Sequence, residues 1–597
     1  MRIKFRGRVT HKYWSRRRRL LVYAIPQRQL GTEPPVLSVV CVYRAAEPTA
    51  EPDVESSVKI FSVLGSLVEA EANFASGIQA TSGQCGLSLT VTMISEYLIA
   101  LVVLAAIFLI GSRFKNRKPT TVPGPSLLQG LWDFLQSMKQ DSLHLTAAKW
   151  ADQYGDIVSL NTLFRQVIFV NSAALTRKLV CDPSTREFSN DRPPTFMGTV
   201  FFYGAQDILL GRYGKDLLKR RKIFHHLLKF YGEGVHNFEA LMKTTSKDLC
   251  QRLTKYEGDV SLSEELAHYI RWVVGLLLKG PETCEEDLDA LIGFIDRATE
   301  CFIFEKEIVL ETVPFAPHIP GLGLRKLVGD LKVAQEVMKQ RFFLAIRETY
   351  HKGERTGIVT DMLDQQAELK EKGNASEMPD DLILGLIQDI ASAAYATTVG
   401  TLNSLFLQLL VDQKLQERIH AEICEVIGDE SPSFEQRRHM PFTEATILET
   451  LRYSSTAPQL LPHYACGDIH FEGHFIPKGT FLILNAWYFH HREDLWEDPW
   501  EFKPERFLDS DGQLLDPEHP TRQNLLPFGT GKRSCPGESF SRIRIFFIVV
   551  TLLQKYRFLP PVDVPLPSTN PKDWKTKTVI CPDEFKCRME PRLTAKA

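Results

Sequence analysis

The sequence predicts a mainly α-helical protein with a small β part, preceded by a single N-terminal transmembrane helix. Three observations carry this prediction. Apolar residues recur at helical spacing over residues 235–256, 330–350, 381–411, 413–427 and 442–453. Segments typical of strands are fewer and shorter, at residues 157–161, 167–170, 470–475 and 480–484. A continuous apolar run, residues 97–110, stands near the start of the chain.

The composition excludes several broad classes of protein. With 44% hydrophobic and 24% charged residues, the 597-residue chain is neither disordered nor fibrous. A net charge of -2 gives no basic field for nucleic acid. The 11 cysteines form no CxxC pair, which disfavours a zinc ribbon or disulfide scaffold and fits a reducing compartment. No repeat, GxGxxG motif or long linker is visible, so we expect one large domain.

Residues 1–92 differ from the rest of the chain. Nine Lys or Arg lie within residues 1–20, and the first acidic residue is Glu33. Such a basic, acid-poor start is typical of a mitochondrial presequence. It is also consistent with a tail upstream of a true start at Met93. We expect residues 1–92 to be an N-terminal extension, disordered or not native.

The apolar run predicts a membrane anchor at residues 93–111. At 1.5 Å per residue, 18 positions are about 27 Å long, which just spans a bilayer core. Four basic residues follow the run within residues 112–118, whereas residues 73–92 contain none. The positive-inside rule therefore places the later chain in the cytosol, and a buried core helix is the weaker alternative. We expect a basic linker with a stiff Pro-Gly-Pro hinge at 112–125, then one domain at 126–597.

The segment Leu526–Glu538 is the strongest candidate for chemistry. Cys535 stands between glycines, which add no bulk and admit positive φ, so its sulfur can approach a flat metal cofactor. Backbone N–H groups, the nearby Arg533 and a following helix, predicted from residues 543–553, would all stabilise a thiolate. A buried cysteine in a glycine-rich turn and a cysteine-protease nucleophile are the alternatives.

This loop is similar to the haem-binding segment of the cytochrome P-450 family of haem-thiolate monooxygenases. The family signature Phe-x-x-Gly-x-Arg-x-Cys-x-Gly is met at Phe528, Gly531, Arg533, Cys535 and Gly537. The resemblance covers about residues 93–595 and implies the cytochrome P-450 fold. It also implies that Cys535 is the axial ligand of the iron of haem b, with Phe528 and Arg533 binding the cofactor.

Other landmarks follow in the family's order. Glu449 and Arg452 lie one helical turn apart, and the resemblance implies that they form a structural charge network with Arg506. It also implies that Arg221 and His463 bind haem propionates. The position that is normally Trp before that arginine is Leu217 here. The segment 470–480, the anchor and the hinge resemble the microsomal animal type.

The long apolar helix predicted at 382–410 aligns with the family's oxygen-activation helix but departs from its pattern. Thr397, the expected catalytic alcohol, is present, whereas Ala396 stands where most members carry an acid. That acid relays protons for cleavage of the O–O bond. With Ala396, the relay must use water or another group, or the reaction needs fewer protons. A purely structural alternative is that Thr397 hydrogen-bonds within its own helix.

The resemblance implies a monooxygenase that inserts one oxygen atom from O2 into a lipophilic small molecule: a sterol, hormone precursor, fatty acid or xenobiotic. Electrons would come from NADPH through a reductase, or from a cytochrome b-type donor. We expect an endoplasmic-reticulum membrane protein with a cytosolic catalytic domain, with mitochondria as the alternative. The expected docking surface for the reductase is Lys219, Arg220, Lys222 and Lys532.

Apolar residues at matching positions are candidates for the substrate pocket: Phe196, Phe201, Phe202, Ala393, Leu460, Leu461 and Val579. Two other functions remain open. One is a haem-thiolate isomerase or lyase that acts on a peroxide without a reductase, favoured by Ala396. The other is a non-catalytic haem-binding protein.

Overall fold

The computed structural model describes residues 23–26, 37–40, 119–162, 165–231, 236–301, 324–576 and 579–592. The chain divides into two units, residues 1–71 and 72–597. In the first unit, β1 (Tyr23–Pro26) pairs antiparallel with β2 (Leu37–Val40). The rest of the predicted extension, and the predicted anchor at 93–111, lie outside the described residues.

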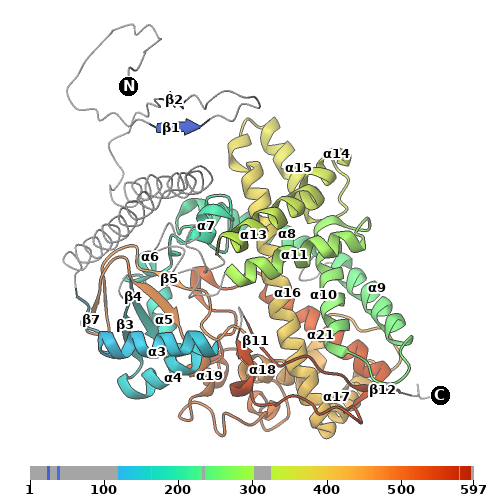
Figure 1. Cartoon of the computed structure of the whole chain (residues 1–597). Coiled ribbons are helices and arrows are strands. Elements are labelled where there is room, and N and C mark those ends of the chain that lie inside the picture. The colour runs from blue at the N-terminus through green and yellow to red at the C-terminus, as the bar shows by residue number, and fades with distance from the viewer. Residues whose placement is uncertain are drawn as a thin grey trace, which may run out of the picture. The chain divides into compact units, whose positions relative to one another are not determined.

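The second unit is mainly helical, as predicted (Figure 1). Its first half contains α3 (Leu127–Gln140), α4 (Leu143–Tyr154), α5 (Ala173–Cys181), α6 (Arg186–Ser189), α7 (Phe196–Val200), α8 (Lys215–Tyr231), α9 (His236–Leu253), α10 (Leu262–Lys279) and α11 (Glu285–Cys301). Its second half contains α13 (Leu324–Lys339), α14 (Ala345–Thr349), α15 (Ile358–Glu371), α16 (Asp380–Val411), α17 (Gln413–Val426), α18 (Pro441–Ser454), α19 (Ala486–His491), α20 (Pro520–Gln523) and α21 (Glu538–Lys555).

The predicted helical segments are found close to their expected bounds. The segment 330–350 differs, because a π-helical turn, Gln340–Leu344, separates α13 from α14. Short 3-10 turns at Ala375–Glu377, Gln436–His439, Pro504–Phe507, Gly531–Arg533 and Pro571–Asp573 complete the helical elements.

Helix α16 is the central helix of the body (Figure 1). Two acidic residues, Asp380 and Asp381, lie in its first turn, where they complement the helix dipole. Asp412 ends it and caps α17 by accepting bonds from the next turn's N–H groups. Within the described ranges, Ala375–Val411 is the one stretch long and apolar enough to cross a membrane. Most of it is buried among other helices, so we interpret it as a core helix.

The β part is small and is built around one four-stranded sheet in the order β3-β4-β8-β5. β3 (Ile157–Asn161) pairs antiparallel with β4 (Gln166–Val170), which runs parallel to β8 (Phe481–Leu484). β5 (His463–Tyr464) pairs antiparallel with β8. Two further pairs join β9 (Tyr556–Leu559) to β12 (Arg588–Pro591) and β10 (Lys575–Thr576) to β11 (Ile580–Cys581).

The segment 470–475 is a hairpin rather than one strand. β6 (Ile469–Phe471) turns back into β7 (His474–Ile476) through Glu472 and Gly473, whose φ angles are 51° and 76°. Two positive φ angles in a two-residue loop match the right-handed twist of the paired strands. The expectation of a continuous strand was therefore wrong at these two residues.

The Pro-Gly-Pro hinge packs on the sheet. Ser159 of β3 donates its N–H to the Pro123 carbonyl at 2.7 Å. A Cβ on Gly124 would lie 1.8 Å from the Ser159 carbonyl oxygen, so only glycine fits. The hinge thus has a fixed place against β3, where the chain enters the body.

Candidate active site

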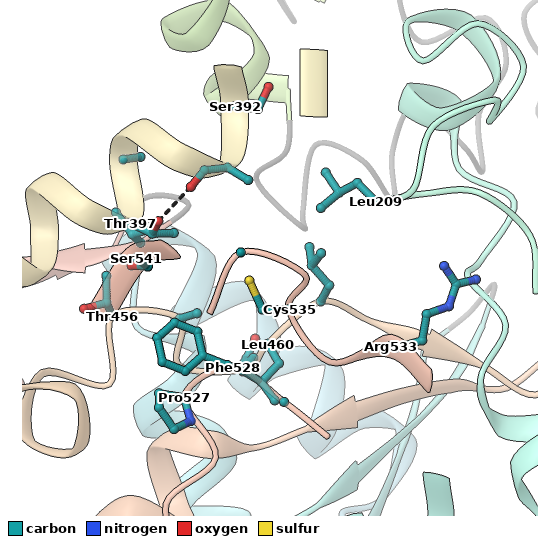
Figure 2. A pocket seen from close by; sticks show the side chains of 18 of the residues that line it. Leu209, Ser392, Thr397, Thr456, Leu460, Pro527, Phe528, Arg533, Cys535 and Ser541 are labelled. Carbon is teal, nitrogen blue, oxygen red and sulfur yellow. Dashed lines mark hydrogen bonds between the residues drawn. The ribbon is translucent and has the colours of Figure 1, made fainter. Parts of the chain in front are cut away.

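A cavity of about 500 Å³ lies between α16, the Cys535 loop and the segment before β5. Much of its lining is apolar, including Leu209, Phe224, Ile390 and Leu461. Figure 2 shows the Cys535 sulfur directed into the cavity, with Thr397 of α16 on one side and Arg533 on the other. The cysteine and guanidinium groups predicted from one motif, and the alcohol predicted from another, therefore line a single cavity.

Two glycines give the Cys535 loop its shape. Gly529 and Gly531 have φ angles of 68° and 72°, a region that L side chains rarely adopt. A Cβ on Gly531 would lie 3.1 Å from the Cys181 sulfur. The Cys535 N–H closes the loop by donating to the Phe528 carbonyl at 2.8 Å, and α21 begins three residues later.

Opposing effects act on the Cys535 thiol. Burial raises its pKa, and a hydrogen bond from the Gly537 backbone lowers it. The Glu538 charge raises the pKa and the Arg221 charge lowers it. The nearby cation is therefore Arg221 of α8, rather than the expected Arg533, because Arg533 turns toward three backbone carbonyls. Coordination to a metal ion would deprotonate the thiol outright.

Four cationic or imidazole side chains gather at one side of the cavity: Arg192, Arg221, Arg533 and His463. Arg533 donates to the carbonyls of Asn190, Ile208 and Gly211 at 2.7, 3.2 and 2.5 Å. Arg221 donates to the Ser534 carbonyl at 2.8 Å, and His463 Nδ1 lies 2.8 Å from the Ser189 carbonyl oxygen.

Arg192 was missed by the sequence reasoning. It is 5% exposed and donates to the carbonyls of Leu209, Leu461 and Pro462. Burial, and then the charges of Arg533 and Arg221, lower its pKa well below the ordinary value. No motif surrounds this residue, so only the fold reveals its place. Three mutually repelling guanidinium groups beside a neutral imidazole form a donor set that fits the two propionates of haem.

The α16 side of the cavity carries alcohols but no acid at the expected place. Thr397 Oγ1 donates to the Ala393 carbonyl at 2.7 Å, so the local helix bond considered from sequence is present. The same residue lines the cavity, as do Ala396 and Ser392. Two turns earlier, Asp389 also lines the cavity and accepts the Ile208 N–H at 2.7 Å.

The charge network expected from Glu449, Arg452 and Arg506 is present in the structure. Arg452 makes two 2.8 Å bonds to the Glu449 carboxylate, and Arg506 lies 3.4 Å from the same carboxylate. Arg452 also donates to the carbonyls of His490 and Glu501. Glu449 and Arg452 are fully buried. Both arginines thus contact Glu449, and backbone carbonyls accept their remaining hydrogen bonds.

The predicted substrate-pocket residues divide into two groups. Ala393, Leu460, Leu461 and Val579 line the cavity. Three phenylalanines, Phe196, Phe201 and Phe202, lie outside the cavity lining, so the expectation needs correction there. Phe201 and Phe202 are fully buried in the main hydrophobic core, and Phe196 packs edge-on against Phe201. Burial in the core, rather than exposure to the cavity, explains the apolar character of Phe201 and Phe202.

Comparisons with known proteins show the family to which this chain is similar. A family model described as Cytochrome P-450 matches residues 122–587. Steroid 17-alpha-hydroxylase/17,20 lyase of Gallus gallus is 30% identical, over 76% of this chain and 89% of its own length. Farnesoate epoxidase of Bombyx mori is 30% identical over 84% of this chain and 100% of its own.

A further relative and a solved structure are also similar to this chain. Vitamin D(3) 25-hydroxylase of Sus scrofa is 30% identical, over 76% of this chain and 90% of its own. The solved structure of a zebrafish cytochrome P-450 with progesterone matches with a TM-score of 0.64 and 26% identity. That match covers 75% of this chain and 99% of the solved one.

Proposed function

Since this chain belongs to the cytochrome P-450 family of haem monooxygenases, we propose that it inserts one oxygen atom from O2 into a lipophilic small molecule, using electrons from NADPH. The observation that carries the proposal is the Cys535 sulfur, which faces an apolar cavity opposite Thr397. Haem is the family's cofactor, and when bound it supplies the activation of dioxygen.

Different residues around the cavity would bind different parts of the haem cofactor. Cys535 would be the ligand of the haem iron, and Phe528 of the same loop lines the cavity beside it. Arg192, Arg221, Arg533 and His463 bind the propionates. Backbone carbonyls already fix the three arginines in place, which favours two carboxylates as their shared partner.

Thr397 is the proposed proton-handling alcohol. Its Oγ1–H donates a hydrogen bond to the Ala393 carbonyl, so the oxygen lone pairs remain free to accept a hydrogen bond from water. Ala396 contributes no carboxylate at this turn. We therefore propose that water in the cavity, held by Thr397, supplies the protons that cleavage of the O–O bond needs.

The proposed substrate class is an isoprenoid-derived lipid. The relatives named above carry steroid, farnesoate and vitamin D(3) in their names, and all three are of this kind. Leu460, Leu461, Val579 and Ala393 supply an apolar wall that suits such a skeleton. A spectral-shift screen that compares sterols, hormone precursors, fatty acids and xenobiotics tests this choice. Shifts confined to fatty acids or xenobiotics would contradict it.

An exposed apolar face on α3 supports membrane association of the catalytic domain. Leu128, Trp132 and Leu135 are 81, 62 and 52% exposed at helical spacing, just after the hinge. We propose that α3 rests on the cytosolic face of the endoplasmic-reticulum membrane beside the predicted anchor. Expression from Met93 should give membrane-bound, haem-loaded protein. Cleavage near residue 30 during import into isolated mitochondria would instead favour the mitochondrial location.

The proposed docking surface for the reductase is smaller than the sequence indicated. Lys219, Lys222 and Lys532 are exposed. Arg220 turns inward, where it donates to the Ala205 carbonyl and the Gln206 side chain. We propose that the three lysines, without Arg220, steer an acidic reductase surface toward the Cys535 side. Replacing them with Glu should slow reduction most at low salt.

One experiment separates the proposed function from its two alternatives. Holoenzyme is mixed with NADPH, a flavoprotein reductase and the best spectral ligand, and product is measured by mass. A monooxygenase gives a product heavier by one oxygen atom only with NADPH and reductase. An isomerase or lyase gives product from a lipid peroxide without them. A non-catalytic haem protein gives neither product.

A further inference from the structure

Arg544 of α21 is a fully buried cation at the contact between α21 and α16. It is 1% exposed and lines the same cavity as Cys535. Its Nη2 donates to the Ala394 carbonyl at 2.9 Å and to the Thr398 hydroxyl, which itself donates to that carbonyl. Arg544 therefore contacts the turn of α16 that carries Thr397.

The charge of Arg544 has no counter-charge in the described part of the chain. Nε and Nη1 are buried without a hydrogen-bond partner, and an aromatic ring, Phe540, lies 5.6 Å from the guanidinium carbon. Burial lowers the Arg544 pKa to about 10, and the side chain therefore remains charged at neutral pH. An unpaired buried charge is costly for folding, so a functional reason for keeping it is expected.

A comparison with Arg542, two residues earlier, shows that the cost is avoidable on this helix. Arg542 lies 3.0 Å from the Glu444 carboxylate and 3.9 Å from that of Glu538. Glu444 is also paired with Arg437, so a network of opposite charges surrounds it. The same helix thus carries one compensated arginine and one uncompensated arginine.

A haem bound in the cavity would supply the missing negative charge when it is reduced. A ferric ion, a porphyrin dianion and one thiolate sum to zero charge. With the propionates offset by their arginines, uptake of one electron from the reductase, with no bond broken and no proton moved, would leave this iron–porphyrin–thiolate unit at −1. We infer that Arg544 is a positioning residue of electrostatic kind, which favours this one-electron reduction of the haem site by the reductase. The inference rests on the haem-thiolate site of the proposed function.

This proposed effect of Arg544 on reduction has the same sign as that of Ala396, the unusual residue of the same turn. Where most family members carry an acid, Ala396 carries no charge, and Arg544 adds a positive one. Both features make the surroundings of α16 more favourable to an added electron. Arg221, and not Arg544, is the cation that lowers the Cys535 pKa. Arg544 therefore acts on the reduced site at longer range.

The test is a spectroelectrochemical titration of four holoenzymes: wild type, Arg544→Lys, Arg544→Met and the matched control Arg542→Met. At a fixed potential, the ferrous-to-ferric ratio of Arg544→Met should be about tenfold lower than that of wild type, the order expected for loss of one partly screened unit charge. Tenfold corresponds to about 59 mV for one electron. Arg544→Lys and Arg542→Met should stay near wild type. Equal potentials for all four proteins would overturn the inference.

A second measurement separates this role from a structural clamp between α16 and α21. Because Arg544→Met removes an unpaired buried charge, its thermal unfolding should be unchanged or raised. If Arg544→Met and Arg544→Gln both failed to bind haem, Arg544 would be a structural clamp and the inference would be wrong. Failure of the proposed function is recognised separately, since wild type itself would then lack the thiolate-type spectrum with carbon monoxide.

Discussion

Two regions of the molecule treat a buried arginine in opposite ways. Behind the Cys535 loop, Arg452 makes two bonds to Glu449 and two to backbone carbonyls, so its charge is fully compensated. Beside α16, Arg544 donates hydrogen bonds to one carbonyl and one hydroxyl, and two of its nitrogens have no hydrogen-bond partner in the described residues. Both side chains are almost completely buried.

We interpret the compensated Arg452 as a charge that stabilises the fold, and the uncompensated Arg544 as a charge that acts on the reaction. The Arg452 region matches its family's pattern, and every polar atom there has a structural partner. The α16 region departs from the pattern at Ala396 and keeps a charge without a counter-charge. We therefore expect substitutions in the first region to affect stability and haem binding. Substitutions in the second region should affect electron and proton supply.

The largest expected effect is on stability, from Arg452→Met. This change leaves the buried Glu449 carboxylate without its main partner, and should lower the free energy of unfolding by about 3–5 kcal/mol. The urea midpoint of detergent-solubilised protein measures it, with Arg544→Met as the matched variant. The double variant with Glu449→Gln should recover part of the loss. Equal midpoints for Arg452→Met and Arg544→Met would remove the contrast between the two regions.

The next largest effect is expected on the amount of product formed per NADPH consumed, after substitutions in the α16 turn that carries Thr397. If proton supply is limited by Ala396, Ala396→Asp should raise the product formed per NADPH consumed. Thr397→Val should lower it, since loss of one proton-transfer group costs about 10²–10⁴-fold in the step it serves.

The alternative for Ala396 is that it provides room for the substrate. Ala396→Asp would then abolish both the ligand-induced spectral shift and the product. A wild-type enzyme that already converts nearly all NADPH into product would contradict the idea of limited proton supply.

The smallest effect concerns a buried acid pair that ties α16 to the loop before α8. Asp389 accepts the Ile208 N–H and Asp207 accepts the Leu210 N–H, each at 2.7 Å. Burial raises the Asp207 pKa from 3.8 to about 6, and burial together with Asp207 raises the Asp389 pKa well above its usual range. A carboxyl whose pKa is raised on folding loses stabilising free energy as the pH rises through the folded value.

Acidification from pH 7 to pH 5 should therefore stabilise wild type relative to Asp207→Asn, by roughly 2 kcal/mol at most. The urea midpoints of the two proteins at both pH values measure this difference. Identical pH dependence in the two proteins would show that Asp207 does not hold the extra proton.

The sequence predicted those features that lie within a short contiguous segment of the chain, and missed those that depend on contacts between distant residues. The Cys535 loop, the Glu449–Arg452 pair and the long central helix are written in short contiguous patterns, and the structure contains them. Arg192 and Arg544 were missed because their importance lies in partners more than a hundred residues away. A buried cation is visible only after folding.

The errors have equally physical reasons. Phe201 and Phe202 were assigned to the pocket because they are apolar and suitably placed in sequence, but apolar character alone cannot distinguish a cavity wall from a packed core. The segment 470–475 was expected to be one strand, but Glu472 and Gly473 adopt positive φ and turn the chain back.

The most direct test of the central claim is the spectrum of the ferrous protein with carbon monoxide. The account predicts a strongly red-shifted Soret band for wild type, because a thiolate ligand donates electron density to the iron. Cys535→Ser should lose this band, whereas Cys181→Ser, which alters an exposed cysteine beside the same loop, should keep it. A Cys535→Ser protein that retained the red-shifted band would contradict the assignment of Cys535 as the iron ligand.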